Sequence, residues 1–172
     1  MEIKIIKPKI TRKKFNLKGK TCNDVVDELN KKFPGHFTTE PKFDVKMNAS
    51  DRSIKSVTIS ADGSIKIPDW PLAKSLGKKT LTEWKRFQAR LDVHEEGHRL
   101  ILLESMAIIA DEAQKWYDAK IANGDVPIGD ELDELYKNEW YGKYYDPPQT
   151  KYDTDTENGK TQDAWFEAIR CD

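Results

Sequence analysis

Two histidines and a glutamate, spaced as His-Glu-x-x-His, are the residues of this chain best suited to chemistry. They are His94, Glu95 and His98, within a long stretch whose apolar residues recur at helical spacing. Residues four apart on an α-helix share one face, so both imidazoles can bind one metal ion. The glutamate after the first histidine can then take a proton from a water that the metal polarises. The pattern predicts a Zn²⁺ site with Glu95 as general base.

The helix surface that carries these histidines is predicted to face the core. At 100° per residue, Glu96 points to the opposite side, which excludes it as the base. An alternative is a pair of structural core histidines, but two at this spacing beside a carboxylate favour the metal. The side chains within about 60° of the histidines are Phe87, Leu91, Ile101, Ser105 and Ile108.

A zinc site needs a third protein ligand, and the same helix does not supply it. Glu112 lies about 20 Å along the axis from His98, and Glu104 is rotated off the face. The tail is the better source, because it follows a helix that can return the chain to the metal. The first candidate in the tail is Asp153. It follows Tyr152, whose phenol can stabilise a developing oxyanion. The candidate ligands are Asp153, Asp155 and Glu157 in the tail, and His36 in an early loop.

The composition predicts a single soluble domain over residues 1–172. Hydrophobic residues make up 37% and charged residues 34%, and no apolar run approaches the ~20 residues that span a bilayer. The first six residues are too few and too charged for a secretory signal, so the chain is cytoplasmic or has lost its signal. The first twenty residues are strongly basic, but lysines alternating with apolar residues favour strands with a solvated face. Nucleic-acid binding is not expected.

A strand-rich first half and a helix-rich second half predict an α+β fold, a small N-terminal antiparallel or mixed sheet packed on a long metal-binding helix. Ala61-Asp62-Gly63 reads as a hairpin turn, Thr80 to Glu83 as a capping box, and Pro147-Pro148 as a helix stop. The expected strands are 2–7, 11–18, 42–48, 56–60 and 64–68. The first expected helix begins at Thr21 or Asn23 and ends near Pro34. Two further helices are expected at 81–121 and 130–144, and the tail from residue 152 is expected to be rich in turns.

Several features keep two interpretations each. Cys22 and Cys171 lack zinc-ligand spacing; they form a disulfide in an oxidising compartment and stay reduced in the cytoplasm. Gly97 allows the close approach of another element or is a tolerated surface glycine. Strand 64–67 is an edge strand that binds substrate or an ordinary sheet strand. One aromatic cluster lines a substrate cleft or packs in a core; it comprises Tyr136, Trp140, Tyr141, Tyr144 and Tyr145.

Three segments resemble the predicted secreted zinc-dependent proteases of bacteria, catalogued as domain-of-unknown-function family 922. They are residues 15–21, then 67–70 with Trp84 and 91–98, and finally 152–159. The resemblance implies a zincin-like fold, a peptide or protein substrate and a secreted or periplasmic location. It also favours Asp153, which falls on the acid of a Tyr-Asp-x-x-Thr-x-His-Gly segment. Asn158 departs from that segment, because a histidine is expected there.

We therefore expect a zinc peptidase that uses metal-activated water, with Glu95 and Tyr152 at the reacting centre and His94, His98 and Asp153 on the metal. The alternative is an inactive zincin-like domain with a structural zinc or a partner-binding role. Coordination separates them, since an open position supports an enzyme and four protein ligands support a structural site.

Overall fold

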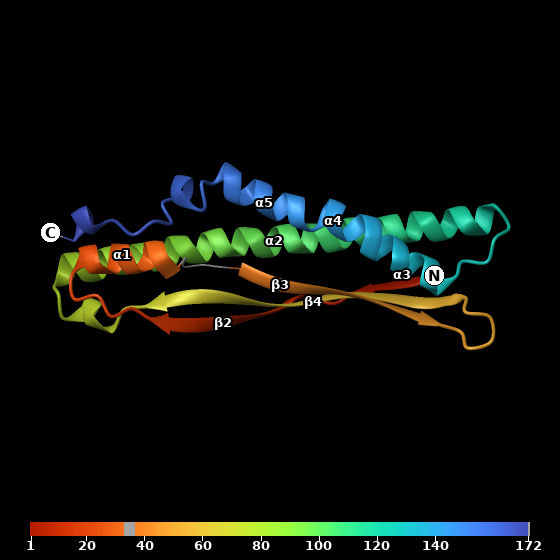
Figure 1. The fold of residues 1–172 in the computed structure, drawn as a ribbon, viewed down its shortest axis with the longest axis horizontal. Coiled ribbons are helices and arrows are strands. Elements are labelled where there is room, and N and C mark those ends of the chain that lie inside the picture. The colour runs from red at the N-terminus through yellow and green to blue at the C-terminus, as the bar shows by residue number, and fades with distance from the viewer. Residues whose placement is uncertain (33–36, 172) are drawn as a thin grey trace. The chain divides into compact units, whose positions relative to one another are not determined.

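The computed structural model describes residues 1–32 and 37–171, which contain both strands and helices, as the sequence predicted (Figure 1). The strands are β1 (Glu2–Ile5), β2 (Lys9–Asn16), β3 (Phe37–Met47) and β4 (Ile54–Asp69). The α-helices are α1 (Cys22–Lys32), α2 (Lys78–Ala122), α3 (Gly129–Leu135), α4 (Tyr141–Tyr144) and α5 (Asp146–Asp155). Short helical turns are η1 (Pro71–Lys74), η2 (Tyr136–Trp140), η3 (Lys160–Gln162) and η4 (Ala168–Arg170).

The described chain forms two compact units. One comprises Met1–Lys9, Thr39–Asp62 and Arg99–Lys151, and the other comprises Ile10–Thr38, Gly63–His98 and Tyr152–Asp172. Both α2 and β4 contribute to each unit. The predicted single domain over 1–172 stays a prediction.

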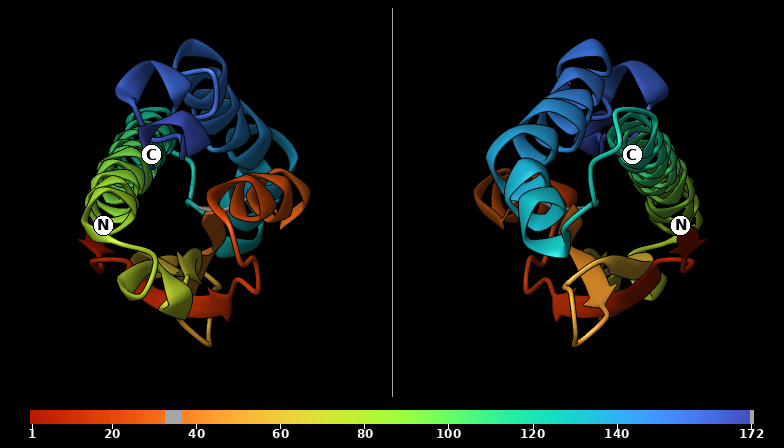
Figure 2. Two further views of the ribbon diagram at one scale, coloured as in Figure 1. Left: turned by 90° about the vertical axis from the view of Figure 1, so that its left-hand side faces the viewer. Right: turned by 90° about the vertical axis from the view of Figure 1, so that its right-hand side faces the viewer.

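Helix α2 is the longest element, with 45 residues, and Figure 2 views it close to its own axis. It continues without interruption past Gly97. Phe87, Leu91 and Ser105 are buried, as their positions on the helix predicted, whereas Ile108 is 38% exposed. Within the described residues, no helix is both long and apolar enough to cross a membrane.

The sheet of the described residues has four strands, with β4 paired to the other three. β1 runs parallel to β4, from Glu2 opposite Ser56 to Ile5 opposite Ile59. β2 is also parallel, since Thr11 bonds to Gly63 and Leu17 bonds to Asp69. β3 is antiparallel, because Asn48 bonds to Ser53 while Thr38 bonds to Ser64. The sheet is therefore mixed.

The hairpin predicted at Ala61-Asp62-Gly63 is wrong, because β4 runs straight through it. Ala61 and Ile65 are both buried, and the Gly63 carbonyl accepts a hydrogen bond from Thr11. Gly63 is not among the residues with positive φ, which a tight hairpin turn requires. Pairing with strands on both sides satisfies the backbone and outweighs the local turn signal.

The predicted capping box and the predicted proline stop are also wrong, although the helical segment ends at Tyr144 as expected. α2 begins at Lys78, and the Thr80 hydroxyl donates to the Cys171 carbonyl instead of capping the helix. Pro147 and Pro148 lie in the first turn of α5 and so begin a helix. Proline fits there because first-turn N–H groups have no helical partner. At α1 the prediction holds, because Thr21 and Asp24 cap each other's backbone N–H groups.

The unit that contains β1 has its own core. The ring of Phe43 in β3 stacks on the ring of Tyr136, with 4.5 Å between the centroids. Leu132 of α3 and Met106 of α2 are buried in the same unit. Tyr136, Trp140 and Tyr145 are each less than 8% exposed. This burial supports the packing interpretation of the aromatic cluster.

The second unit packs an aromatic core between α1, α2 and the tail. Trp70, Trp84, Phe87 and Phe166 contact one another edge-on or tilted, with centroids 5.4 to 5.9 Å apart. The buried Trp70 indole donates to the Gly19 carbonyl at 2.8 Å. This core fixes the half of α2 that carries the histidines.

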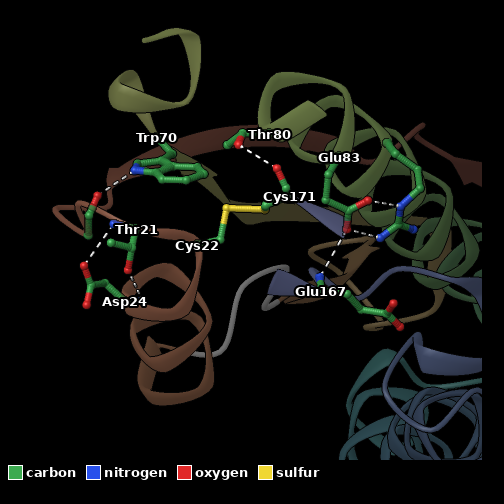
Figure 3. Close-up of a disulfide and its surroundings, with 10 residues drawn as sticks. Thr21, Cys22, Asp24, Trp70, Thr80, Glu83, Glu167 and Cys171 are labelled. Carbon is green, nitrogen blue, oxygen red and sulfur yellow. Dashed lines mark hydrogen bonds and ion pairs between the residues drawn. A yellow bond between two sulfur atoms is a disulfide. The ribbon is translucent and has the colours of Figure 1, made fainter. Parts of the chain in front are cut away.

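A disulfide joins Cys22 at the start of α1 to Cys171 in the tail (Figure 3). The buried Glu83 carboxylate holds the same tail, accepting from the Glu167 backbone N–H at 3.1 Å while it pairs with Arg86. Of the two states left open by the sequence, the structure has the bridge. The tail is thereby tied at several points to α1 and α2.

Loss of this disulfide should lower the free energy of unfolding by about 2–5 kcal/mol. The bridge joins residues 149 apart in sequence, so it removes much freedom from the unfolded chain. Urea unfolding of the parent with and without reductant measures the effect. A Cys22→Ser/Cys171→Ser control should show no reductant dependence. Equal stability of the oxidised parent and this variant would contradict the prediction.

Candidate metal centre

Three potential ligand atoms converge at the middle of α2. The Nε2 atoms of His94 and His98 lie 3.5 and 3.0 Å from Oδ1 of Asp153. One ligand atom from each residue lies within 4.8 Å of the others. Both histidines are 5% exposed, while the Asp153 side chain is 42% exposed. Two imidazoles and a carboxylate form a donor set that could hold a metal ion.

The remaining candidates for the third ligand lie elsewhere. Asp155 and Glu157 are exposed and do not join the cluster in the described part of the chain. His36 lies outside the described residues. Helix α5 places Asp153 two residues from its C-terminal end, where the chain reaches the histidines. The structure thus brings together His94, His98 and Asp153, as the sequence analysis expected.

The His94 ring is held by a closed hydrogen-bond network. Its Nδ1 lies 3.0 Å from Oε1 of Gln162, and the Gln162 amide donates to the Tyr152 hydroxyl at 3.0 Å. The Tyr152 hydroxyl donates to the His94 carbonyl at 3.2 Å. These roles agree when Nδ1 carries the proton, which leaves the Nε2 lone pair toward Asp153. Burial lowers the pKa of His94, favouring the neutral imidazole that binds metal.

Tyr152 packs against both histidines. Its ring stacks on His94 with centroids 5.1 Å apart and meets His98 edge-on at 4.9 Å. Its hydroxyl donates a hydrogen bond to the His94 carbonyl and accepts one from the Gln162 amide. In this arrangement Tyr152 contacts both histidine rings. The expectation that its phenol stabilises an oxyanion stays a prediction.

Two glycines permit this packing. A Cβ on Gly97 would lie 2.0 Å from the Tyr152 hydroxyl oxygen, so the close-approach interpretation of Gly97 is confirmed. A Cβ on Gly159 would lie 3.2 Å from Cγ of His94, and Gly159 also has φ +87°. The chain after α5 therefore turns directly against the ligand ring.

Gly97→Ala should weaken zinc binding by roughly 10-fold or more, because the methyl displaces Tyr152 and with it the neighbouring Asp153. Helix propensity alone favours alanine, so the loss would not come from α2 itself. Gly142→Ala in α4 is the matched control, since its Cβ would meet nothing within 4 Å. Titration against a chromophoric chelator measures both affinities. Equal affinity of the two variants would show that Tyr152 does not position the site.

Glu95 is a buried carboxylate without a described partner. It is 1% exposed, and neither carboxylate oxygen has a hydrogen-bond partner among the residues that the structure describes. Burial raises its pKa to about 8, and repulsion from Asp153 and Asp92 adds to the shift, while Arg12 opposes it. Glu96 is exposed, as its position on the helix predicted. A buried carboxyl group without a described partner, next to a group of possible metal ligands, is typical of a site that binds a metal ion and water.

A cavity of about 680 Å³ opens beside these residues. His94, Glu95, His98 and Asp153 form one part of its wall, and Asn158 also lines it. Among the described residues, Lys32 and Lys66 are the other charged residues of the wall. The apolar part consists mainly of Val26, Leu29, Phe37, Phe87, Leu91 and Phe166.

A family model described as "Bacterial protein of unknown function (DUF922)" matches residues 12–159. The chain belongs to this family. Comparisons with curated proteins and with solved structures each found no match. The family 922 match includes His94, Glu95, His98 and the Tyr152–Gly159 segment, whereas Gln162 lies beyond it. The resemblance expected from the motifs is thus confirmed at the level of the family.

Gln162 is the site residue that the sequence analysis missed. It follows the Tyr152–Gly159 segment by three residues, and no motif includes it. Its position results from the turn formed by Glu157, Asn158 and Gly159, which all have positive φ. An Asn-Gly pair after a helix is the only sequence signal of that turn.

Proposed function

We propose that this chain is a zinc-dependent peptidase with a zincin-like arrangement, in which Glu95 is the general base. The observation that carries the proposal is the environment of Glu95. Its carboxylate is buried, lacks any described hydrogen-bond partner and shares a cavity with His94, His98 and Asp153. Such burial is costly unless a ligand uses the group.

The residues fit the roles of this chemistry. Bound zinc would supply the Lewis acid that activates water and the scissile carbonyl. Glu95 takes the proton of the attacking water and delivers it to the leaving amine. Gln162 fixes the tautomer of His94, and Tyr152 holds both histidine rings. The exposure of Asp153 leaves the donor set accessible from the side where substrate enters.

Strand 64–67 is an ordinary sheet strand and not an edge strand, because β4 pairs with every other strand of the described sheet. β3 reaches β4 through Thr38, which bonds to Ser64, and β4 then continues to Asp69. Lys66 of this continuation lines the cavity beside the histidines. The proposed substrate of the chain is a peptide or protein.

The disulfide supports a secreted or periplasmic location, because such bridges persist in oxidising compartments. Cytoplasmic protein would keep Cys22 and Cys171 reduced. Thiol counting on protein trapped with an alkylating reagent from its native source distinguishes the two.

The test is a digest of a mixed peptide library by the zinc-loaded chain, followed by mass spectrometry. Cleavage at internal peptide bonds is expected, together with its loss on chelation and its return with added zinc. A chain that binds zinc at these residues but leaves every peptide intact would favour the alternative, a zincin-like domain with a structural or partner-binding role.

A further inference from the structure

We infer that the cavity beside the metal ligands is a specificity pocket for bulky apolar side chains, aromatic or branched aliphatic, of the substrate residues next to the cleaved bond. The position of the pocket next to a cleaved bond rests on the proposed peptidase function. The apolar chemistry of its ligand rests on the residues that line the cavity. A volume of about 680 Å³ lies in the range of sites that enclose a small ligand.

The floor of the pocket belongs to the core. Leu29, Phe87, Leu91 and Phe166 line it and are each 5% exposed or less. Their packing fixes the shape of the pocket before any ligand enters. Burying an apolar side chain against this wall removes it from water, which is the main source of affinity in such sites.

The rim distinguishes among side chains by charge. Lys66 is exposed, and none of the described residues forms an ion pair with it. Lys32 is bonded to Glu28 and to the Asn16 carbonyl. Apart from the residues of the proposed zinc site, the two charged residues in the described part of the wall are thus cations. Lysine and arginine side chains are therefore disfavoured in the pocket.

Three hydroxamates test the pocket without any cleavage. Acetohydroxamate, 4-methylpentanohydroxamate and 3-phenylpropanohydroxamate share one zinc-binding head and differ in the apolar arm. Calorimetry on the zinc-loaded chain should give at least about 10-fold tighter binding for the two larger compounds. Val26→Trp places an indole at the half-buried wall and should remove this preference, leaving acetohydroxamate binding within about 2-fold. Ile169→Trp is the matched control at an 84% exposed position and should keep the preference.

A second readout needs no metal. Titration of the metal-free chain with N-acetylphenylalaninamide should shift the methyl NMR signals of Val26, Leu29 and Leu91. N-acetyllysinamide should leave them in place. Equal affinity for all three hydroxamates, or unmoved methyl signals, would overturn the pocket while leaving the peptidase proposal intact. Retained apolar preference without hydrolysis of any peptide would overturn the peptidase proposal and leave the pocket.

Discussion

Glu95→Gln is expected to reduce peptide hydrolysis by about 10²–10⁴-fold while zinc stays bound. The amide preserves the shape of the side chain but cannot accept the proton of water. The carboxylate is buried and unpartnered, so its replacement breaks no hydrogen bond of the described structure. Initial rates on one peptide, measured beside elemental analysis, give both quantities.

Glu96→Gln is the matched control for this variant. Glu96 is the neighbouring acid and is exposed on α2, so its substitution should leave the rate within about 2-fold. A Glu95→Gln variant that cleaves as fast as the parent would exclude Glu95 as the base. Equal losses in both variants would point to a general effect on the helix.

Asp153→Ala should weaken zinc binding by at least about 10-fold. Even the loss of a residue that only hydrogen-bonds to a metal ligand has an effect of that size. Its carboxylate oxygen lies 3.0 Å from Nε2 of His98 and 3.5 Å from Nε2 of His94. Removing it leaves two ligands, too few to hold the ion well. Competition with a chromophoric chelator measures the change.

Asp155→Ala is the control for the same helix end, because Asp155 is exposed and lies outside the ligand cluster. Its affinity should equal that of the parent. The reverse result, with a loss in Asp155→Ala and none in Asp153→Ala, would move the third ligand. A loss in His36→Ala alone would place it before β3.

Much of the fold and of the candidate site was predicted from the spacing of residues along single helices and strands. The His-Glu-x-x-His spacing on a helix was enough to place His94 and His98 together and to expose Glu96. These relations depend on a single helix, whose geometry is the same in every protein. The mixed class of the fold followed from the same kind of pattern, since strand-like and helical segments occupy different halves of the chain. The burial of Glu95 was not predicted and is a finding of the structure.

Tertiary contacts decided the rest. The turn signal at Asp62-Gly63 lost to strand pairing on both sides of β4, and Pro147-Pro148 began a helix because first-turn positions tolerate proline. Gln162 reaches His94 across 68 residues, and no local pattern encodes such a contact. Close approach at Gly97 was one of two interpretations from the sequence, but only the structure shows that Tyr152 is the residue that approaches it.

Zinc content per chain tests the central claim most directly. The purified protein is equilibrated with excess Zn²⁺, freed of unbound metal, and analysed for metal and protein in one sample. The parent should hold one zinc per chain, and His94→Ala and His98→Ala should each hold almost none at the same free zinc concentration. Full occupancy in both histidine variants would contradict a metal centre at His94, His98 and Asp153.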